Sequence, residues 1–484
     1  MISYQLLNNK LLISYINDKG KIAHYSHVIP DDEMFTWEKS RTKTGYRNHL
    51  GGYARKNYNK KPNRFRIWEI IYGFDDEIRN TISNDNEPDT WFMDIETEVI
   101  DGFPDVDNPR EKVLTNSFCN NNIVVSTGIK DLSAMDKEWI QQEINRHLAP
   151  INKKYNFKFK HYPSEQLMLK ELFSVFVPSM PMIVGWNFLK FDWAYLVARA
   201  TRLGLNKFVL KSSPTGVMED YYIKDKYNRN HKQKIRLPLH RIVLDDLTLW
   251  EKYDYSMKIK SSAKLDNVAK EVLGIKKVEY NDTFMGMYNK DYKRYVFYNA
   301  IDTILNKEIH DKLGYFNSLN KLSMLTHTPM NQALFVSHCL ESRFVESYLA
   351  RGRHMVSNSN NDTDTYSGAF VKEPNPGIFD NVLISDFESL YPNLTMKFNI
   401  STDTYMGVKS SDSTYICRFT NEEKKLQLGE KHIVTEEGTV FASDKIGVAP
   451  EIINRLINER LYSKKTANEI DAEKNYLENL LKSM

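Results

Sequence analysis

The sequence is poor in cysteine and contains no long apolar run. Its three cysteines, Cys119, Cys339 and Cys417, lie far apart and form no C-x-x-C pair. This spacing excludes a disulfide framework and a cysteine zinc site, and it is typical of reduced thiols in a cytosolic protein. Because no apolar stretch approaches about 18 residues, we expect no membrane-spanning helix. The first ten residues also lack the basic and then apolar order of a signal peptide.

The sequence has no large excess of either charge. Its net charge is +3 at pH 7 over 484 residues. Bulk charge therefore neither favours nor excludes a nucleic-acid partner, and only local clusters of charge can do so. A chain of this length is too long to fold around a single hydrophobic core, so we expect two to four domains.

Residues 1–90 are predicted to form a small α+β or all-β domain. Apolar and polar residues alternate over 4–15 and 22–28, and residues 64–72 are predicted as another strand. Between these strands, arginines and lysines alternate with tyrosines over residues 41–61. This pattern suits phosphate contacts and base stacking on a nucleic-acid strand, but a solvated loop explains it equally well.

Two acids in a predicted strand are the first sign of a metal site. Asp94 and Glu96 are separated by one residue within the stretch 91–98. Side chains alternate along a strand, so both carboxylates project from one face while Met93 and Ile95 point to the other. Adjacent acids repel unless a cation lies between them, and their oxygens favour Mg²⁺ or Mn²⁺ over zinc. For these two residues alone, a half-exposed polar strand is the simpler explanation.

Two further acids lie on predicted helices. Asp192 follows a short apolar strand and precedes a helix over 193–203. Its position suits a metal ligand, and equally an acid that interacts with the helix dipole. On a long helix over 291–313, Tyr298 and Asp302 are one turn apart and share a face. A buried acid requires either a salt-bridge partner or a metal, and both alternatives remain open.

Together these residues predict a catalytic metal site. Four carboxylates can hold two divalent ions about 4 Å apart, the arrangement that in-line hydrolysis of a phosphodiester requires. Tyr298 is placed to orient the attacking water. We therefore predict that Asp94, Glu96, Asp192 and Asp302 bind two Mg²⁺ or Mn²⁺ ions.

The sequence changes character after the long helix. Helices are expected over 316–356, followed by a polar connector over 358–366. Within the connector, Asp362, Thr363 and Asp364 have no apolar strand on either side. We therefore exclude these three residues as an active site.

A further strand and a long helix are predicted toward the C-terminus. A buried strand over 381–386 ends in Asp386, and several short strands follow over 404–442. A charged helix over 451–481 carries Arg460 and Lys464 one turn apart. Two cations on one helical face suit the binding of phosphates, although a solvated charged helix is the alternative.

The motifs resemble those of a known enzyme family. The four acids and the tyrosine resemble the DEDD-type 3′–5′ exonucleases whose third motif carries a tyrosine. More narrowly, the chain resembles the replicative family B DNA polymerases of T4-like bacteriophages. Five stretches carry this resemblance in the family's order: Asp94-Ile-Glu96, Asn187-Phe-Leu-Lys-Phe-Asp192, Tyr298-Asn-Ala-Ile-Asp302, Gly368-Ala-Phe-Val-Lys-Glu-Pro374 and Asp386-Phe-Glu-Ser-Leu-Tyr-Pro392.

The resemblance implies an α/β multidomain fold. It predicts an N-terminal α+β domain over 1–90 that is completed by about 316–357. An RNase H-like 3′–5′ exonuclease domain would occupy 91–315. A partial polymerase palm would follow over 358–446, and residues 447–484 would begin the fingers.

The resemblance also assigns roles to exonuclease residues. Asp94, Glu96 and Asp302 would bind the first metal ion. Asp94, together with Asp192 directly or through water, would bind the second. Asn187 and Phe191 would contact the frayed 3′ end of the primer. The basic segment 221–241, predicted as a hairpin, would help to separate primer from template.

Polymerase residues are implied in the same way. Asp386 and the backbone of Phe387 would bind a polymerase metal. The backbone amides of Ser389 and Leu390 would contact the triphosphate, and Tyr391 would exclude a ribose 2′-hydroxyl. Arg460 and Lys464 would meet the phosphates of the incoming deoxynucleoside triphosphate.

The chain departs from the family in what it lacks. The second fingers helix, the palm Asp-Thr-Asp hairpin and the thumb are missing. We therefore expect the chain alone not to polymerise DNA, and we interpret it as the N-terminal part of a split or truncated enzyme. A C-terminal polymerase chain would be its partner, with DNA as substrate and other replisome proteins as further candidates. The resemblance places this activity in the cytoplasm of an infected bacterial cell.

Two other functions remain in competition with a polymerase subunit. One is a stand-alone exonuclease in which the palm segment is only structural. The other is a non-catalytic nucleic-acid-binding subunit. The retained Asp386, Tyr391 and Arg460 disfavour a pure nuclease, and the complete set of acids disfavours a non-catalytic protein.

Overall fold

The computed structural model describes residues 1–100, 102–224, 232–254, 262–275, 278, 283–357 and 371–483. Their contacts divide the mixed α/β chain into two compact units, each assembled from two segments. Unit 1 comprises Met1–Ile29 with Asp75–Cys339, and unit 2 comprises Pro30–Phe74 with Leu340–Met484. The family-based domain boundaries remain predictions. None of the described helices combines the length and the apolar character needed to cross a bilayer.

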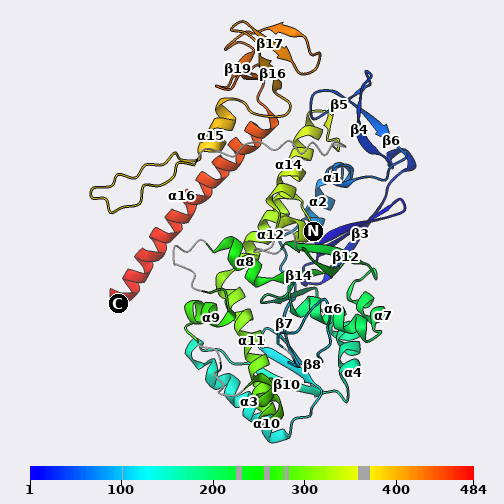
Figure 1. Ribbon diagram of the computed structural model, residues 1–484, viewed down its shortest axis with the longest axis vertical. Coiled ribbons are helices and arrows are strands. Elements are labelled where there is room, and N and C mark those ends of the chain that lie inside the picture. The colour runs from blue at the N-terminus through cyan, green and yellow to red at the C-terminus, as the bar shows by residue number, and fades with distance from the viewer. Residues whose placement is uncertain are drawn as a thin grey trace. The chain divides into compact units, whose positions relative to one another are not determined.

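Unit 1 contains a six-stranded sheet in the order β10-β9-β8-β7-β11-β14 (Figure 1). Its strands are β7 (Thr90–Thr97), β8 (Val113–Asn120), β9 (Ile123–Gly128), β10 (Asn156–His161), β11 (Met182–Gly185) and β14 (Ile242–Asp245). Strand β8 runs antiparallel to both β7 and β9, whereas β10, β11 and β14 pair in parallel with their neighbours. The sheet is therefore mixed, with β8 as its one reversed strand.

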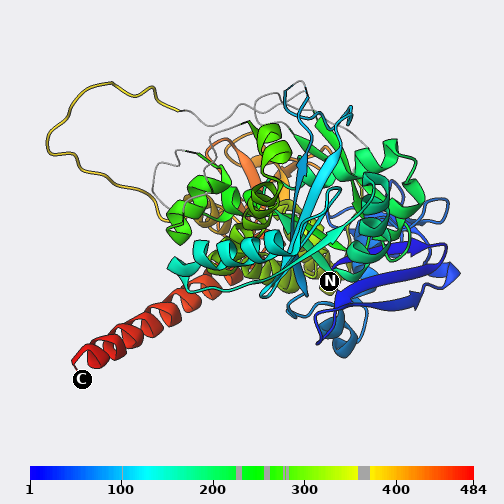
Figure 2. The same cartoon turned by 90° about the horizontal axis from the view of Figure 1, so that it is seen from below.

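Helices cover both faces of this sheet, as Figure 2 shows around the cyan strands. One face packs against α3 (Ala134–His147), α9 (Leu265–Leu273) and α11 (Tyr292–Leu313), and the other against α4 (Glu165–Glu171) and α6 (Asp192–Arg202). On β7, Phe92 joins the first core, while Met93 and Ile95 join the second. The predicted alternation along this strand is therefore confirmed, and it places Asp94 and Glu96 on the α11 face.

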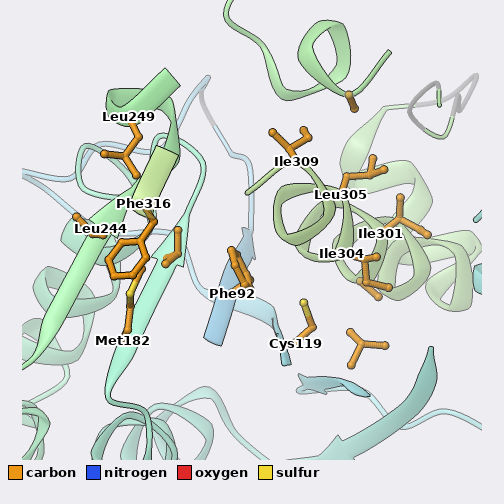
Figure 3. Packing of buried hydrophobic residues seen from close by; sticks show 14 of the residues in the cluster. Phe92, Cys119, Met182, Leu244, Leu249, Ile301, Ile304, Leu305, Ile309 and Phe316 are labelled. Atoms are coloured by element: carbon orange, nitrogen blue, oxygen red, sulfur yellow. The ribbon is translucent and has the colours of Figure 1, made fainter. Parts of the chain in front are cut away.

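Helix α11 is the main buried helix of unit 1. It begins after Asp291, whose side chain accepts a hydrogen bond from the Arg294 amide at 3.4 Å, and it ends at Gly314 in the left-handed conformation. Figure 3 shows its apolar residues, among them Ile304 and Leu305, packed near Phe92 and Cys119 of the sheet. These bounds agree with the helix predicted over 291–313.

Unit 1 also contains a three-stranded sheet, a hairpin and several further helices. Three antiparallel strands, β1 (Ser3–Leu7), β2 (Lys10–Ile16) and β3 (Ile22–Val28), lie near the N-terminus. Strand β3 agrees with the strand predicted over 22–28, whereas the run predicted over 4–15 is divided into two strands by a turn at Asn8 and Asn9. The short elements are α2 (Asp76–Ile82), η2 (Ala149–Ile151), η3 (Leu172–Phe176), α5 (Val177–Ser179), α7 (Asn206–Val209), η4 (Leu210–Ser212), α8 (Asp246–Tyr253), α10 (Phe284–Lys290), α12 (Tyr315–Thr326) and α13 (Met330–Ala333). A hairpin of β12 (Met218–Lys224) and β13 (Lys232–Pro238) lies between η4 and β14 in the sequence.

Among its described residues, unit 2 contains two sheets, the helices α1, α15 and α16, and α14 from Leu340 onward. The first sheet has the order β15-β5-β6-β4, and the second the order β18-β17-β16-β20-β19. Helix α15 packs along α16, and Figure 1 shows the two side by side. The bounds are η1 (Asp31–Glu33), β4 (Thr36–Ser40), β5 (Tyr46–Asn48), β6 (Tyr53–Asn57), α1 (Arg64–Tyr72), α14 (Val336–Ala350), β15 (Arg353–His354), α15 (Leu390–Lys397), β16 (Tyr405–Lys409), β17 (Thr414–Cys417), β18 (Glu423–Lys425), β19 (His432–Val434), β20 (Thr439–Ala442) and α16 (Val448–Ser483).

Residues 64–72 form helix α1, so the strand predicted there is wrong. The Asn63 side chain accepts a hydrogen bond from the Arg66 amide at 3.0 Å and caps the helix. Residues 64–72 are mostly apolar but include Arg64, Arg66 and Glu69. A short, mostly apolar run does not by itself distinguish a buried helix from a buried strand. The cap at Asn63 is the signal that favours the helix.

The basic and aromatic segment 41–61 is not a plain solvated loop, because it supplies β5 and β6. Its cations lie over aromatic rings: Arg47 is 4.2 Å from the Tyr53 ring centroid and Lys56 is 4.6 Å from that of Phe35. These contacts hold the charged side chains against the sheet. They leave the predicted role in nucleic-acid binding untested.

A buried histidine links the N-terminal strands to the sheet region of unit 1. His240 is fully buried in a left-handed conformation, and its Nδ1 lies 2.9 Å from the Ser3 hydroxyl and 2.7 Å from the Ser14 hydroxyl. Burial, with a smaller effect of His24, lowers the pKa of His240 to about 4. The folded protein therefore holds this ring neutral at pH values at which the unfolded chain protonates it.

We predict that unit 1 loses stability as the pH falls from about 6.5 to about 4. In this range the unfolded chain binds more protons at His240 than the folded chain, so protonation favours unfolding, by up to about 3 kcal/mol in total. His240→Asn should flatten this part of the pH profile, because asparagine tolerates the left-handed backbone and does not titrate. Urea unfolding between pH 4 and pH 8 measures the effect, with the exposed His161→Asn as control. An unchanged slope in His240→Asn would contradict the assignment.

Candidate metal centre

Three carboxylates predicted to bind metal lie together in unit 1. Asp94 and Glu96 come from β7 and Asp302 from α11, and each offers an oxygen within 4.8 Å of the other two. Asp94 and Glu96 are partly exposed, whereas Asp302 is 6% exposed. A group of hard oxygen donors that opens to solvent on one side fits a divalent ion such as Mg²⁺ or Mn²⁺.

The packing of α11 over β7 brings these acids together. The Asn299 side chain donates to Asp94 Oδ2 at 2.6 Å, and the Tyr295 hydroxyl donates to the Thr97 carbonyl at 3.4 Å. Both residues lie within two helical turns of Asp302 and face the same strand. Burial, followed by the nearby Glu96, raises the pKa of Tyr295, so its hydroxyl stays protonated and can donate.

Asp192, the fourth predicted ligand, lies beside this group and is not one of its three members. It begins α6, is 5% exposed, and accepts a hydrogen bond from the backbone amide of Ile95 at 3.1 Å. Burial raises the pKa of Asp192 to about 7, against the effect of its amide donors, and the carboxylates of Asp245 and Asp302 add to the increase. Because Ile95 lies between Asp94 and Glu96 in the sequence, this hydrogen bond holds the Asp192 carboxylate next to the strand that carries those two acids.

Asp245 is a fifth acid in this region and was not predicted from the sequence. Its carboxylate accepts hydrogen bonds from the Leu189 amide at 3.2 Å and from the Leu247 amide at 3.1 Å. Burial raises the pKa of Asp245 to about 6. The residue caps helix α8 and also fixes the turn between β11 and α6, which carries Asn187 and Asp192. Its place at the end of a parallel strand next to β11 was the available signal.

That turn exposes the residues predicted to meet the 3′ end. Asn187 is partly buried in a left-handed conformation, which asparagine tolerates. The ring of Phe191 lies 4.6 Å from that of Phe103 and 5.5 Å from that of Tyr195. Phe103 itself is 79% exposed and was not predicted from the sequence. An exposed ring next to Phe191 is suited to stacking with a nucleobase.

The hairpin predicted over 221–241 is present in its two described arms. Strands β12 and β13 pair antiparallel, from Met218 opposite Pro238 to Lys224 opposite Lys232. The basic tip, residues 225–231, lies outside the described residues. Tyr298 is half-buried on α11 one turn before Asp302, with its ring 5.3 Å from that of Phe284.

The strand predicted over residues 381–386 is not formed. In unit 2 these residues belong to no helix or strand, and Val382, Leu383 and Ile384 are 65%, 93% and 87% exposed. A strand requires a neighbour for its backbone hydrogen bonds, and among the described residues this segment pairs with none. The prediction of a buried strand from its apolar run was therefore wrong.

The predicted polymerase residues of unit 2 are exposed, except for Ser389, which is partly buried. Asp386 accepts a hydrogen bond from the Phe387 amide at 2.9 Å, and Ser389 precedes α15 in a left-handed conformation. Leu390 and Tyr391 occupy its first turn and are 42% and 74% exposed. Arg460 and Lys464 are also exposed, one turn apart on α16 as predicted. Residues 358–370, which include Asp362, Thr363, Asp364 and Gly368, lie outside the described residues.

Comparison of the sequence with known protein families identifies the family of this chain. Residues 53–268 match the family model described as "DNA polymerase family B, exonuclease domain", and residues 323–482 match "DNA polymerase family B". Together the two ranges include more than half of the chain. The chain therefore belongs to DNA polymerase family B and carries the exonuclease domain of that family. Tyr298 and Asp302 lie between the two ranges, and it is the structure that brings Asp302 to the acids of β7.

Several curated proteins are similar to the chain. The "DNA-directed DNA polymerase" of Escherichia phage RB69 is 22% identical over 300 residues, which cover 62% of this chain and 32% of that protein. The protein of the same description from Enterobacteria phage T4 is 22% identical over 315 residues, covering 64% and 34%. "DNA polymerase 2" of Aeropyrum pernix is 28% identical over 293 residues, covering 58% and 32%. The chain spans about a third of the length of these relatives.

We predict that Asp245→Ala destabilises unit 1 by about 2–4 kcal/mol, because it leaves the buried amide of Leu189 and the partly buried amide of Leu247 without an acceptor. Asp245→Asn should cost less, because its carbonyl oxygen can still accept one of the two hydrogen bonds. The exposed Asp220→Ala serves as control and should change stability by less than about 0.5 kcal/mol. Urea denaturation measures all three variants, and equal midpoints for Asp245→Ala and Asp220→Ala would refute the capping role.

Proposed function

We propose that unit 1 is a proofreading 3′–5′ DNA exonuclease that uses two divalent ions, Mg²⁺ or Mn²⁺. The observation that carries this proposal is the group of Asp94, Glu96 and Asp302, with Asp192 hydrogen-bonded to the same strand, in a chain that matches the family's exonuclease domain. Its mixed sheet with one reversed strand and helices on both faces supports an RNase H-like fold.

Each residue has a role in this proposal. Asp94, Glu96 and Asp302 would hold one ion, and Asp94, together with Asp192 directly or through water, would hold the second. Bound ions of this kind activate water and stabilise the leaving oxygen of a phosphodiester. Tyr298 orients the water from one turn away from Asp302. Asn187 and Phe191, supported by Phe103, hold the single-stranded 3′ end at the exposed side of the acids.

We further propose that unit 2 supplies part of a polymerase site in a replicative enzyme. Asp386 and the Phe387 backbone would bind metal, and Ser389, Leu390, Tyr391, Arg460 and Lys464 would bind the deoxynucleoside triphosphate. The palm would begin near residue 358 and the fingers near 447. Such an enzyme would act on primer-template DNA in the cytoplasm of an infected bacterial cell, as the phage relatives suggest.

The exposed apolar surface of unit 2 supports the need for a partner chain. The segment Val382–Ile384 and residues Leu461, Tyr462 and Ile470 of α16 are between 51% and 93% exposed. Apolar surface of this extent usually marks an interface. A polymerase chain that pairs with residues 381–386 and packs along α16 would cover it. A stand-alone exonuclease is the second candidate, favoured by the presence of all four exonuclease acids within unit 1.

We predict that Asp94→Ala abolishes Mg²⁺-dependent degradation of single-stranded DNA from its 3′ end. Loss of one ligand removes both ions in this proposal, so the rate should fall by at least about 10³-fold. A 5′-labelled oligonucleotide resolved on a gel measures the rate. Asp131→Ala, at a largely exposed carboxylate, is the matched control and should retain activity. Cleavage that survives in Asp94→Ala would overturn the site.

We predict that the chain alone incorporates no deoxynucleotide into a primer-template. Co-expression with the product of the reading frame downstream should restore extension if that product is the partner, and Asp386→Ala should then abolish extension while leaving the exonuclease active. Primer extension with labelled primers measures both activities. Polymerisation by the isolated chain would refute the requirement for a partner.

A further inference from the structure

A series of hydrogen bonds between buried polar side chains connects the sheet to Asp94. The Asn299 amide nitrogen lies 2.6 Å from Asp94 Oδ2, and its amide oxygen lies 2.6 Å from the Ser117 hydroxyl. The Ser117 hydroxyl in turn lies 2.6 Å from that of Ser126. Asn299, Ser117 and Ser126 are all fully buried.

The register of the sheet aligns Asp94, Ser117 and Ser126 across three neighbouring strands. We call these three residues, together with Asn299, the row. Asp94 of β7 is directly opposite Ser117 of β8, and Ser117 is directly opposite Ser126 of β9. Directly opposite residues share a face, which here is the face covered by α11. The serines are small enough to leave room for the Asn299 side chain above them. Gly128 at the end of β9 also allows α11 to lie close, because a Cβ there would overlap the Tyr292 hydroxyl.

The hydrogen bonds of this row can run in only one direction. A carboxylate accepts, so Asn299 must present its NH₂ group to Asp94. Its carbonyl oxygen must then accept from the Ser117 hydroxyl, which uses the single hydrogen of that serine. Ser126 must therefore donate to Ser117. A flipped Asn299 amide would place its oxygen against the carboxylate, so the two serines hold the amide in the one favourable orientation.

We propose that Asn299 is a positioning residue that orients Asp94 for binding of the divalent ion, and that Ser117 and Ser126 fix the Asn299 amide. The inference rests on the proposed metal site. With Oδ2 of Asp94 held by Asn299, the rotation of the carboxylate is restricted, so the carboxylate keeps one orientation relative to Glu96 and Asp302. Helix α11 thus sets two ligands, Asp302 directly and Asp94 through Asn299. Partners of metal ligands typically change metal affinity by 10- to 100-fold when they are removed.

The same helix contains a matched control residue. Asn306 lies two turns beyond Asn299 on the same face of α11 and is 3% exposed. Within the described part of the chain, its amide group has no hydrogen-bond partner. Asn299→Ala and Asn306→Ala therefore make the same chemical change at two buried positions of one helix. They differ in whether the side chain reaches a metal ligand.

The test is Mn²⁺ binding to the full chain, measured by electron paramagnetic resonance, with the Tm of each variant recorded in the absence of metal. We expect Asn299→Ala to weaken Mn²⁺ binding by about 10- to 100-fold, and Asn306→Ala to leave it unchanged. Ser117→Ala should weaken binding less, because Asn299 remains but its amide is free to flip. Exonuclease activity of Asn299→Ala should recover at saturating Mn²⁺, which a general loss of structure would not allow.

The outcomes separate this inference from the proposed function. If the unaltered chain binds no Mn²⁺, the proposed metal site fails, and this inference fails with it. If the unaltered chain binds Mn²⁺ and Asn299→Ala binds it equally well, the inference alone is overturned. Should Asn299→Ala not fold, Ser117→Ala decides: unchanged Mn²⁺ affinity in a folded Ser117→Ala protein would overturn the role of the row.

Discussion

Repulsion between carboxylates is the unfavourable interaction that the fold of unit 1 has to overcome. Asp94, Glu96 and Asp302 offer oxygens within 4.8 Å of one another, and Asp192 and Asp245 are buried close by with raised pKa values. Gathering these acids opposes folding unless other interactions compensate. The apolar face of α11, packed on Phe92 and its neighbours, provides much of that compensation. The fold thus holds in place a set of acids that would otherwise separate, and a bound cation would lower the repulsion.

Part of this arrangement could be predicted from the sequence because it depends on local periodicity. Strand alternation placed Asp94 and Glu96 on one face, and helical spacing placed Tyr298 one turn from Asp302. The helices predicted over 291–313 and 193–203 agree to within one residue with α11 and α6. Such features require only a few neighbouring residues, so no tertiary information is needed.

Other features depend on register and on contacts between distant segments. Asp245 and Asn299 were missed because their contacts with Leu189 and Asp94 depend on which strands and helices are neighbours in the fold, and residues close in sequence do not show this. Residues 64–72 were assigned to a strand because an apolar run fits both kinds of element. The segment 381–386 has the composition of a strand, but a strand also needs a neighbour, and composition carries no information about one. Predictions failed where the deciding partner lies far away in the sequence.

The central strand β8 has a consequence for the motions of unit 1. All eight of its residues, Val113–Asn120, are buried, and it is hydrogen-bonded to β7 on one side and β9 on the other. Backbone amides in such a strand exchange their hydrogens with deuterated water only when the sheet itself opens. The row that leads to Asp94 is therefore anchored in the part of the unit that opens most rarely. The phosphodiester chemistry proposed for this site would take place at the edge of a rigid platform, and the loops around it would supply the movement.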